Sequence, residues 1–236
     1  MVEGRLAGRI AVITGASRGI GAKVAEAFAA EGAHVILVAR TVGGLEAVDD
    51  AVRARGGSAT LVPFDLVDFP AIDRLGGVIA ERYGRLDVVV GNAAILGSLR
   101  PMGHFPPEEW ERVFAVNVHA NWRLIRSFDV LLRAAPAGRA IFVTSGAART
   151  VFPYFGAYGA SKAALEHMVR IYAAEVRKTR VRANLLDPGV VRTAMRAQAF
   201  PGEDPETVAP PEAVAPAFVD LALPECTRNG DIVRAG

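Results

Sequence analysis

The chain has 236 residues and a mass of 24.9 kDa, with 51% hydrophobic residues, 22% charged residues and a mean hydropathy of +0.26. This composition excludes a disordered chain, and a formal net charge of only +2, with no long block of either sign, argues against a nucleic-acid partner. The single cysteine, Cys226, excludes an internal disulfide framework and any zinc site that needs several cysteines.

No targeting, membrane or metal signal is found along the sequence. The opening stretch MVEGRLAGRIAVITG has an acidic residue and two arginines before a short apolar run, which is not the pattern of a signal peptide. No window approaches the ~18 uninterrupted apolar residues of a membrane span. The four histidines share no metal-ligand spacing. We therefore expect a cytoplasmic protein without membrane contact and without a metal site.

Strand-like apolar runs alternate with helical patterns along the whole chain. The predicted strands are residues 10–13, 34–39, 59–64, 86–91, 140–145 and 181–187, followed by the closing GDIVRAG. The predicted helices are residues 19–31, 43–55, 71–82, 107–133, 157–178 and 212–221. Runs such as VILVA and VVVG are apolar at every position, which is typical of parallel strands covered on both faces.

This alternation, with right-handed crossovers, predicts a single α/β domain over residues 1–236. Its core is an open, doubly wound parallel sheet of about seven strands with helices on both faces. Such sheets bind their ligand at the carboxyl ends of the strands. The segment from Arg196 to Pro211 is irregular, with four prolines and several acids. It is either a solvated loop or, taken as about residues 193–211, a lid over the site.

A glycine-rich turn, TGASRGIG, joins the first strand to the first helix. Glycines there let the backbone approach a pyrophosphate, and the helix N-terminus supplies N–H donors. With its G-x-x-x-G-x-G spacing, the turn resembles the cofactor motif of the classical short-chain dehydrogenase/reductase family. GNAA after the fourth strand is similar to that family's Asn-Asn-Ala-Gly motif, from which Gly91 and Ala94 depart. The resemblance covers about residues 6–195 and implies a Rossmann-type fold.

The resemblance extends to particular residues and to a subgroup. The stretch RTAMRAQAFPGEDP is similar to a poorly characterised bacterial oxidoreductase subgroup of the family. The DPGVVRT segment after the sixth strand resembles the family's Pro-Gly segment, whose following residues contact the nicotinamide carboxamide. The cofactor-binding residues that these motifs imply are Gly15, Ser17, Arg18, Gly19, Ile20, Gly21, Asn92, Ala93, Ala94, Pro188, Gly189, Val190 and Thr193.

The end of the second strand indicates which nicotinamide cofactor is bound. A dinucleotide fold that uses NAD usually has Asp or Glu there, whereas this chain has Ala39, Arg40 and Thr41. Arg40 and Arg18 favour NADP(H) by contacting the 2′-phosphate, and the alternative is that both are merely solvated. Asp65 and Leu66 match the family's adenine-contacting positions. The alternative for Asp65 is a helix cap, a role for which Asp68 competes.

A tyrosine and a lysine four residues apart, Tyr158 and Lys162 in YGASK, project from one face of a predicted helix. An adjacent ammonium lowers the pKa of a phenol, and together with an oxidised nicotinamide it could make Tyr158 a general acid or base. Ser145 ends the fifth strand, where its hydroxyl could hold a carbonyl oxygen. Asn117 lies within the long predicted helix, and the family uses an Asn there to hold a water in a proton relay toward the lysine. The resemblance also places Tyr158 and Lys162 among the cofactor-binding residues, with Lys162 holding the ribose.

The substrate pocket is predicted to be apolar. Its candidate residues are Ile95, Leu96, Ala147, Phe152, Tyr154, Phe155, Val191 and Met195, with no lysine or arginine aimed into that space. The two phenylalanines could instead belong to the core. The sequence thus predicts an NADP(H)-dependent oxidoreductase that acts on a small apolar carbonyl or alcohol. The alternatives are a 3-oxoacyl-carrier reductase and a non-catalytic NADP-binding regulatory protein. The resemblance also implies a homodimer or homotetramer.

Overall fold

The computed structural model describes residues 4–235, and within them lies one sheet of seven parallel strands. The strands are β1 (Ile10–Thr14), β2 (His34–Ala39), β3 (Ser58–Pro63), β4 (Val88–Gly91), β5 (Arg139–Val143), β6 (Arg182–Asp187) and β7 (Ile232–Arg234). Their order in space is β3-β2-β1-β4-β5-β6-β7. The order reverses between β1 and β4, and at this point doubly wound sheets open a crevice for a ligand. The predicted fold class is confirmed.

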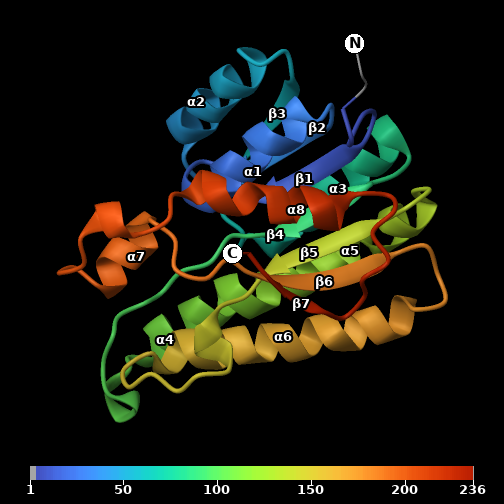
Figure 1. Cartoon of the computed structure of the whole chain (residues 1–236). Coiled ribbons are helices and arrows are strands. Elements are labelled where there is room, and N and C mark those ends of the chain that lie inside the picture. Colours follow the sequence, from blue (N-terminus) through green and yellow to red (C-terminus); the bar gives the residue numbers. More distant parts are fainter. Residues whose placement is uncertain (1–3, 236) are drawn as a thin grey trace.

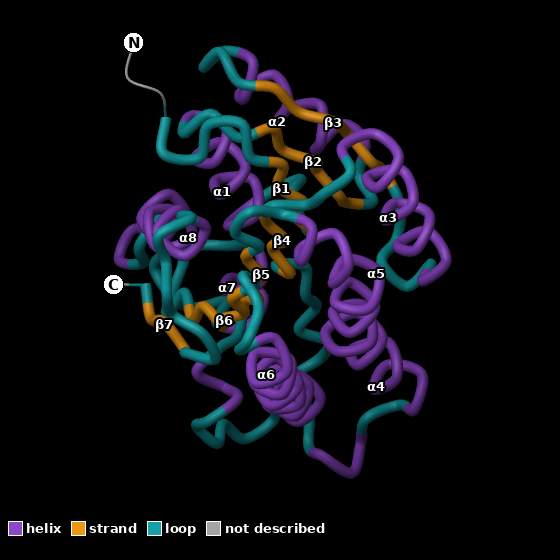
Figure 2. Tube along the Cα trace, turned by 90° about the vertical axis from the view of Figure 1, so that its right-hand side faces the viewer, coloured by secondary structure: helices purple, strands orange, loops and turns teal. Residues whose placement is uncertain are grey.

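Helices cover both faces of the sheet (Figures 1 and 2). The α-helices within the described residues are α1 (Gly19–Ala30), α2 (Val42–Arg53), α3 (Phe69–Tyr83), α4 (Pro107–Phe114), α5 (Ala120–Ala134), α6 (Gly156–Val176), α7 (Ala194–Ala199) and α8 (Ala215–Ala222). Figure 2 shows α1 and α8 on one side of the sheet and α3 and α5 on the other. None of the helices within residues 4–235 has the length and apolar character that crossing a bilayer requires.

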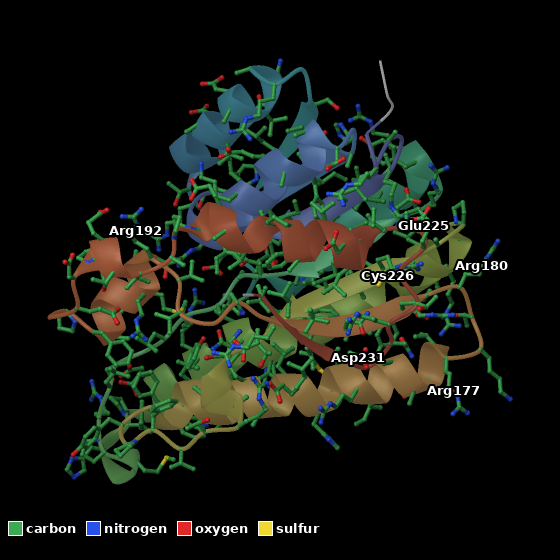
Figure 3. All side chains as sticks on the ribbon, in the orientation of Figure 1. Arg177, Arg180, Arg192, Glu225, Cys226 and Asp231 are labelled. Atoms are coloured by element: carbon green, nitrogen blue, oxygen red, sulfur yellow. The ribbon has the colours of Figure 1, made fainter. Side chains whose placement is uncertain are left out.

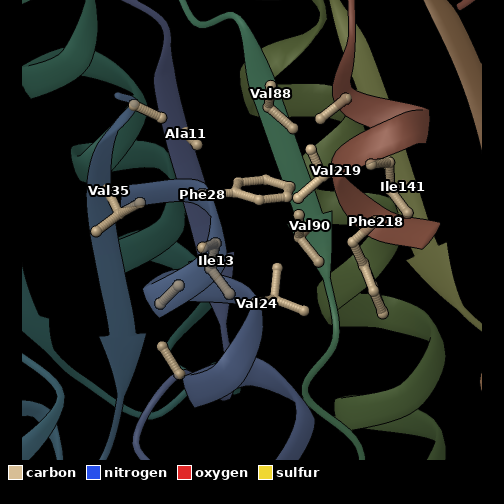
Figure 4. Packing of buried hydrophobic residues seen from close by; sticks show 14 of the residues in the cluster. Ala11, Ile13, Val24, Phe28, Val35, Val88, Val90, Ile141, Phe218 and Val219 are labelled. Atoms are coloured by element: carbon tan, nitrogen blue, oxygen red, sulfur yellow. The ribbon is translucent and has the colours of Figure 1, made fainter. Parts of the chain in front are cut away.

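Alternate residues of the central strands enter two separate cores. Ala11 and Ile13 of β1 pack with α1, α2 and α8, whereas Val12 packs with α3, α5 and α6. Figure 4 shows the first of these cores, where Phe28 of α1 lies next to Val219 of α8 over β4, and Phe218 of α8 belongs to the same core. Both phenylalanines are fully buried. Because side chains leave a strand on both faces, a strand between two helical layers must be apolar throughout, as the sequence is.

The helix predicted over residues 107–133 is helical throughout, but its middle is π-helical and not α-helical. α4 ends at Phe114, a π-helical segment called η2 (Ala115–His119) follows, and α5 continues from Ala120. In a π-helical turn each backbone hydrogen bond spans one residue more than in an α-helix. Such turns are frequent at functional sites. Asn117 lies within η2 and is fully buried.

The segment predicted as an irregular loop or lid is partly ordered into short helical elements. α7 is followed by two 3₁₀ turns, η4 (Pro205–Thr207) and η5 (Pro211–Val214), and each turn begins at a proline. Figure 1 shows α7 standing apart from the helical layers, at one end of the sheet. A β-bridge between Val191 and Ala209 joins the two ends of this segment.

Candidate active site

A cavity of about 850 Å³ opens at the carboxyl ends of the strands, on both sides of the switch point between β1 and β4. This volume is within the range of small-molecule sites, about 300–1,000 Å³. Of the residues predicted for catalysis and cofactor binding, all but Gly21, Asn117 and Val190 line the cavity. The structure therefore brings together motifs that are widely separated in the sequence.

The glycine-rich turn forms the floor of one end of the cavity. Gly15 and Gly19 have φ values of +65° and +58°, in the region that favours glycine. A Cβ on Gly21 would lie 2.3 Å from the carbonyl oxygen of Gly15, so position 21 serves close packing. No side chain caps the first turn of α1, which begins after Arg18. The N–H groups of that turn are thus available to an anionic group such as a pyrophosphate.

Thr14 and Asn92 join the ends of β1 and β4 below this turn. The Thr14 hydroxyl donates to the carbonyl of Val90 and accepts from the backbone N–H groups of Asn92 and Ala93, at 3.0 and 3.1 Å. The Asn92 amide donates to the carbonyl of Thr14 at 2.9 Å. Asn92 therefore holds the glycine turn in place with its side chain. Thr14 was missed in the sequence, although it directly precedes Gly15.

The departures from the family's Asn-Asn-Ala-Gly motif have local explanations. A Cβ on Gly91 would lie 2.4 Å from the Asn121 amide oxygen and 2.4 Å from the Phe142 ring, so these side chains occupy the space of a residue 91 side chain. Ala94 does not need a glycine, because Tyr154 is the one non-glycine residue with positive φ among residues 4–235. The backbone at Ala94 is therefore unstrained.

We expect Gly91→Ala to lower the free energy of unfolding by about 1–3 kcal/mol, the usual cost of overpacking a core. The added Cβ would overlap both Asn121 and Phe142, which are buried. Urea unfolding measures the change. Gly77→Ala in α3 is the matched control, because its Cβ would meet nothing within 4 Å and a helix favours alanine. Equal stability of the Gly91 variant and wild type would contradict the account.

The end of the cavity next to β2 and β3 carries three arginines and one carboxylate. Arg40 and Arg18 are exposed at its edge. The Asp65 carboxylate accepts from Arg112 of α4 at 2.7 Å and lies 3.8 Å from Arg40. Partial burial raises the pKa of Asp65, but the hydrogen bond from Arg112, a backbone N–H and Arg40 together bring it below its usual value. Arg112 was missed in the sequence.

The alternative that Asp65 caps a helix is wrong. Asp68 is the N-cap of α3, and its carboxylate accepts from the backbone N–H of Ala71 at 3.2 Å. Asp65 accepts instead from the N–H of Val67 at 3.2 Å and lines the cavity next to Leu66. Its position is compatible with the predicted contact to an adenine.

Ser145, Tyr158 and Lys162 meet at the other end of the cavity. Ser145 follows β5 and accepts from the N–H of Ala147 at 3.3 Å. Tyr158 and Lys162 lie on one face of α6, with the lysine Nζ 5.8 Å from the centre of the tyrosine ring. The Lys162 ammonium is buried and donates to the carbonyl of Val143 at 2.7 Å. β5 and α6 therefore fix the three groups.

Without a bound cofactor the pKa of Tyr158 is raised, and the lowering expected from Lys162 together with an oxidised nicotinamide stays a prediction. Burial raises the pKa of Tyr158, a hydrogen bond with Ser145 lowers it, and the Asp187 carboxylate raises it further. Burial also lowers the pKa of Lys162 to about 8, against an opposing effect of Glu166. Tyr158 is thus a protonated donor at neutral pH.

We expect the pH dependence of stability to differ between wild type and Lys162→Met. Folding lowers the pKa of Lys162 from 10.5 to about 8, so between these values the unfolded state binds more protons. Wild type therefore gains stability relative to the variant as pH rises from 8 to 10.5, by up to about 3 kcal/mol. Below pH 8 both states are protonated and the difference is constant. Urea unfolding from pH 7 to 10.5 measures it, and a constant difference throughout would contradict the shift.

Asn117 lies behind the cavity lining and holds the loop after β4. Its amide oxygen accepts from the N–H of Ile95 at 2.9 Å, and its amide nitrogen donates to the carbonyl of Ile95 at 3.0 Å. The same nitrogen donates to the hydroxyl of Ser161 at 3.0 Å. The Asn117 carbonyl accepts from the Asn121 amide at 2.8 Å. Its side chain is therefore fully engaged, and the relay role stays a prediction.

Ser161 and Asn121 were missed as site residues, although both had a signal in the sequence. Ser161 directly precedes Lys162, is fully buried, and donates to the carbonyl of Tyr158 at 2.7 Å. Asn121 follows Asn117 by four residues, so the two amides share a helix face. A pair of amides on an otherwise apolar face indicates a buried polar network.

The Pro-Gly segment after β6 borders the same end of the cavity. Pro188, Gly189 and Thr193 line it. Val190 is half exposed and does not line the cavity. The Thr193 hydroxyl accepts from the N–H of Arg196 at 3.2 Å and so caps α7. The position of the Val190 side chain therefore does not favour a contact with the cofactor.

The segment that carries α7 covers part of the cavity. The Gln198 amide donates to the carbonyl of Gly97 at 3.1 Å and so bridges the segment to the loop after β4. Met195 and Phe200 line the cavity from this side. This placement supports the lid alternative over a freely solvated loop.

The substrate end of the cavity is mostly apolar. Of the predicted pocket residues, Ile95, Leu96, Phe155, Val191 and Met195 line it, and Ala147, Phe152 and Tyr154 do not. The Phe155 ring lies 5.7 Å from that of Phe152 and 6.1 Å from that of Phe200. The core alternative for the two predicted phenylalanines is wrong, because Phe155 lines the cavity and Phe152 is 46% exposed.

The expectation that no arginine reaches this space is also wrong. Arg192 and Arg196 line the cavity. The Arg196 guanidinium donates to both carboxylate oxygens of Glu203, and that of Arg192 donates to Glu206. Figure 3 labels Arg192 at the segment that carries α7. Each arginine charge is thus balanced by a carboxylate a few residues further along the chain.

Comparison with known proteins shows the family of the chain. The short chain dehydrogenase family matches residues 9–204. The chain belongs to this family. It is 38% identical over 216 residues to the uncharacterized oxidoreductase YciK of Escherichia coli K12, over 90% of this chain and 85% of that protein. It is also 36% identical to a fatty acyl-CoA reductase of Acinetobacter baylyi, over 87% of this chain and 70% of that one.

Solved structures of short chain dehydrogenases have the same fold. A short chain dehydrogenase from Salmonella enterica serovar Typhi superposes with a TM-score of 0.95 at 33% identity, over 100% of this chain and 98% of that one. One from Escherichia coli CFT073, complexed with NADPH, gives a TM-score of 0.94 at 36% identity, over 100% and 99% of the two chains. The predicted membership of a poorly characterised bacterial subgroup is confirmed by the similarity to YciK.

Proposed function

We propose that this short chain dehydrogenase transfers a hydride between NADP(H) and an apolar carbonyl compound or the corresponding alcohol. The observation that carries the proposal is the meeting of Ser145, Tyr158 and Lys162 in the cavity that begins at the glycine turn. A nucleotide bound on that turn would place its reactive end beside these three side chains. Tyr158 is protonated at neutral pH, which is the form that donates a proton when the carbonyl is reduced.

Each side chain of the site would have a separate role in the reaction. When bound, NADPH supplies the hydride. Ser145 donates a hydrogen bond to the carbonyl oxygen and orients it, and Tyr158 donates its proton to that oxygen. Lys162 holds a positive charge four residues along the same helix face, which favours the phenolate left behind. Asn117 fixes the loop at Ile95, against which the substrate would rest.

The adenosine end supports NADP(H) over NAD(H). Arg40 stands where a carboxylate would hold a free ribose hydroxyl, and Arg18 lies at the same edge of the cavity. The glycine turn supplies an uncapped helix N-terminus for the pyrophosphate. The similarity to a structure complexed with NADPH agrees with this choice.

The substrate end supports an uncharged, apolar compound. Its lining is formed by aliphatic and aromatic side chains, namely Ile95, Leu96, Phe155, Val191, Met195 and Phe200. The two arginines that reach this end are balanced by Glu203 and Glu206. Both arginines of the lid segment therefore have a carboxylate partner. A small negatively charged substrate would find no unpaired arginine of this segment to bind.

The test is NADPH oxidation with a panel of ketones, aldehydes, quinones and 3-oxoacyl thioesters, with Tyr158→Phe as the blank. Turnover of a panel member that depends on Tyr158 would establish the reductase. A preference for 3-oxoacyl thioesters over small ketones would favour the alternative that the protein is a 3-oxoacyl-carrier reductase. Measurable NADPH binding with no turnover of any member would favour the regulatory alternative.

We also propose that the protein assembles as a homodimer or homotetramer through α5 and α6. Trp122 and Val130 of α5 and Ile171 of α6 are large apolar residues that are 49–74% exposed. Large apolar side chains left exposed on two neighbouring helices are what an interface between subunits would cover. Light scattering would give the mass in solution, and a value equal to the single-chain 24.9 kDa would rule the assembly out.

A further inference from the structure

Two buried carboxylates and one arginine lie directly behind the catalytic pair. Glu166 follows Lys162 by four residues on the same face of α6, and Asp187 is the last residue of β6. Both acids are only 6% exposed. Arg149 comes from the loop that follows Ser145 and reaches both of them. Asp187 is the first residue of the DPGVVRT segment, whereas Glu166 and Arg149 lie outside the motifs that identify the family in this sequence.

The contacts of this group connect three parts of the site. One Nη of Arg149 donates to a Glu166 oxygen and the other donates to an Asp187 oxygen. The same Glu166 oxygen accepts from the Thr144 hydroxyl at 2.7 Å. The second Asp187 oxygen accepts from the N–H of Gly189 at 3.1 Å. A single guanidinium thus joins the loop after β5, the catalytic face of α6 and the Pro-Gly segment after β6.

Buried carboxylates of this kind require compensation. An ionised carboxylate taken out of water costs several kcal/mol unless it is paired and hydrogen-bonded. Arg149 is the cation that contacts both Glu166 and Asp187 among the described residues. With one arginine for two acids, the balance leaves a negative charge beside the Lys162 ammonium.

We propose that Arg149 is a positioning residue of the active site, which holds α6 against the Pro-Gly segment and balances the charge of Glu166 and Asp187 next to Lys162 and Tyr158. This inference rests on the proposed function, because it assigns a role to Arg149 in the chemistry of that pair. The role is indirect, since Arg149 does not line the cavity.

The two acids act on the catalytic pair in the directions that this role requires. Glu166 raises the pKa of Lys162 against the larger lowering by burial. Asp187 raises the pKa of Tyr158, in addition to burial. Loss of the Arg149 charge would strengthen both effects, because each carboxylate would lose its partner. The lysine would then hold its proton to higher pH, and the phenol would ionise less readily.

Other titratable groups on the elements around α6 are engaged elsewhere. The Arg112 guanidinium of α4 pairs with Asp65, and the His119 ring of η2 lies against Phe69. Glu109 of α4 pairs with Arg100, and the two arginines of the lid segment have their own carboxylates. The groups that face Lys162 and Tyr158 are therefore Ser145, Glu166 and Asp187, with Arg149 behind the two acids.

The test follows the ionisation of Lys162 itself. The chain has three lysines, Lys23, Lys162 and Lys178, so ¹³Cε-lysine NMR gives few signals, and Lys162→Met assigns the one of interest. In Arg149→Met we expect the midpoint of Lys162 to rise by about one pH unit, a tenfold change in its ionisation constant. Glu166→Gln should lower the midpoint, and Arg149→Lys should restore it close to wild type.

Arg177→Met is the matched control. Arg177 lies just past the end of α6 and is exposed, far along the helix from Lys162 (Figure 3). It is in no ion pair with another residue of the described chain. We expect its variant to leave the Lys162 midpoint within a few tenths of a unit of wild type.

A structural role alone would lower the stability of Arg149→Met without moving the Lys162 midpoint, and that result would overturn the proposal. If Arg149→Met fails to fold, the Glu166→Gln variant provides the test. A Lys162 midpoint that is unchanged or raised in Glu166→Gln would also overturn the proposal. The NMR readout needs no substrate. A shifted midpoint with no carbonyl reduction would therefore count against the proposed function and leave this inference standing.

Where turnover is found, the pH profile gives a second readout. In Arg149→Met the alkaline change in kcat/KM should move in the same direction as the Lys162 midpoint, because the two report one pair of groups. An unmoved profile together with an unmoved midpoint would leave Arg149 as a packing residue only.

Discussion

Tyr158→Phe is expected to reduce kcat by about 10²–10⁴-fold, the usual contribution of a positioned general acid, while the Kd for NADPH stays within about twofold. The substitution removes one hydroxyl and keeps the half-buried ring on α6. Ser145 would still hydrogen-bond the carbonyl oxygen, but no side chain would deliver the proton. Steady-state turnover and fluorescence titration with NADPH measure the two effects separately.

Tyr83→Phe is the matched control for this variant. Tyr83 is the last residue of α3, where its ring lies 5.9 Å from that of His34, and it does not line the cavity. It should retain full turnover. Undiminished turnover in Tyr158→Phe would refute the assignment of the general acid. Parallel loss of turnover and NADPH binding would instead indicate that the tyrosine supports the cofactor site.

Much of the fold could be predicted because its signals are local in the sequence. The strand Val88–Gly91 is apolar at every position, and the glycine turn between β1 and α1 has its own spacing. Parallel strands then place everything that follows them at one edge, so Ser145 and Asn92 could be assigned to one cavity from their position after β5 and β4. Local pattern and topology were sufficient for that step.

Other features could not be predicted because they depend on contacts between distant residues. The π-helical turn at Asn117 accompanies a side chain that binds the backbone of Ile95, 22 residues earlier. Arg149 and Asp187 are separated by 38 residues, and nothing in the sequence indicates that they pair. The raised pKa of Tyr158 arises chiefly from burial, which spacing to Lys162 does not reveal. Spacing predicted which groups meet, and packing determines how they ionise.

The cofactor preference provides the second large expected effect. In Arg18→Ala/Arg40→Ala we expect the Kd for NADPH to rise about a hundredfold or more, while the Kd for NADH changes little. Each arginine would make a charge-assisted hydrogen bond to the 2′-phosphate, worth about 1.5–3 kcal/mol, and 1.4 kcal/mol corresponds to tenfold in affinity. Both cofactors can be titrated by fluorescence under the same salt conditions, which matter because exposed charges are screened.

The surroundings of the two arginines explain why they are free to act. Arg40 lies 3.8 Å from Asp65, but that carboxylate is already hydrogen-bonded to Arg112 at 2.7 Å. Arg18 has no carboxylate partner among residues 4–235. A 2′-phosphate would therefore displace little when it binds between them. The structure thus leaves two cations with weak competition at the edge where the phosphate would lie.

Arg74→Ala is the control, since Arg74 is equally exposed but pairs with Asp68 outside the cavity. It should change neither Kd. If the double variant bound NADPH and NADH more weakly by the same factor, the arginines would contact the pyrophosphate, which both cofactors share. Unchanged affinity for NADPH would mean that they are solvated. Only a selective loss of NADPH identifies the 2′-phosphate as their partner, because that phosphate is the one group in which the two cofactors differ.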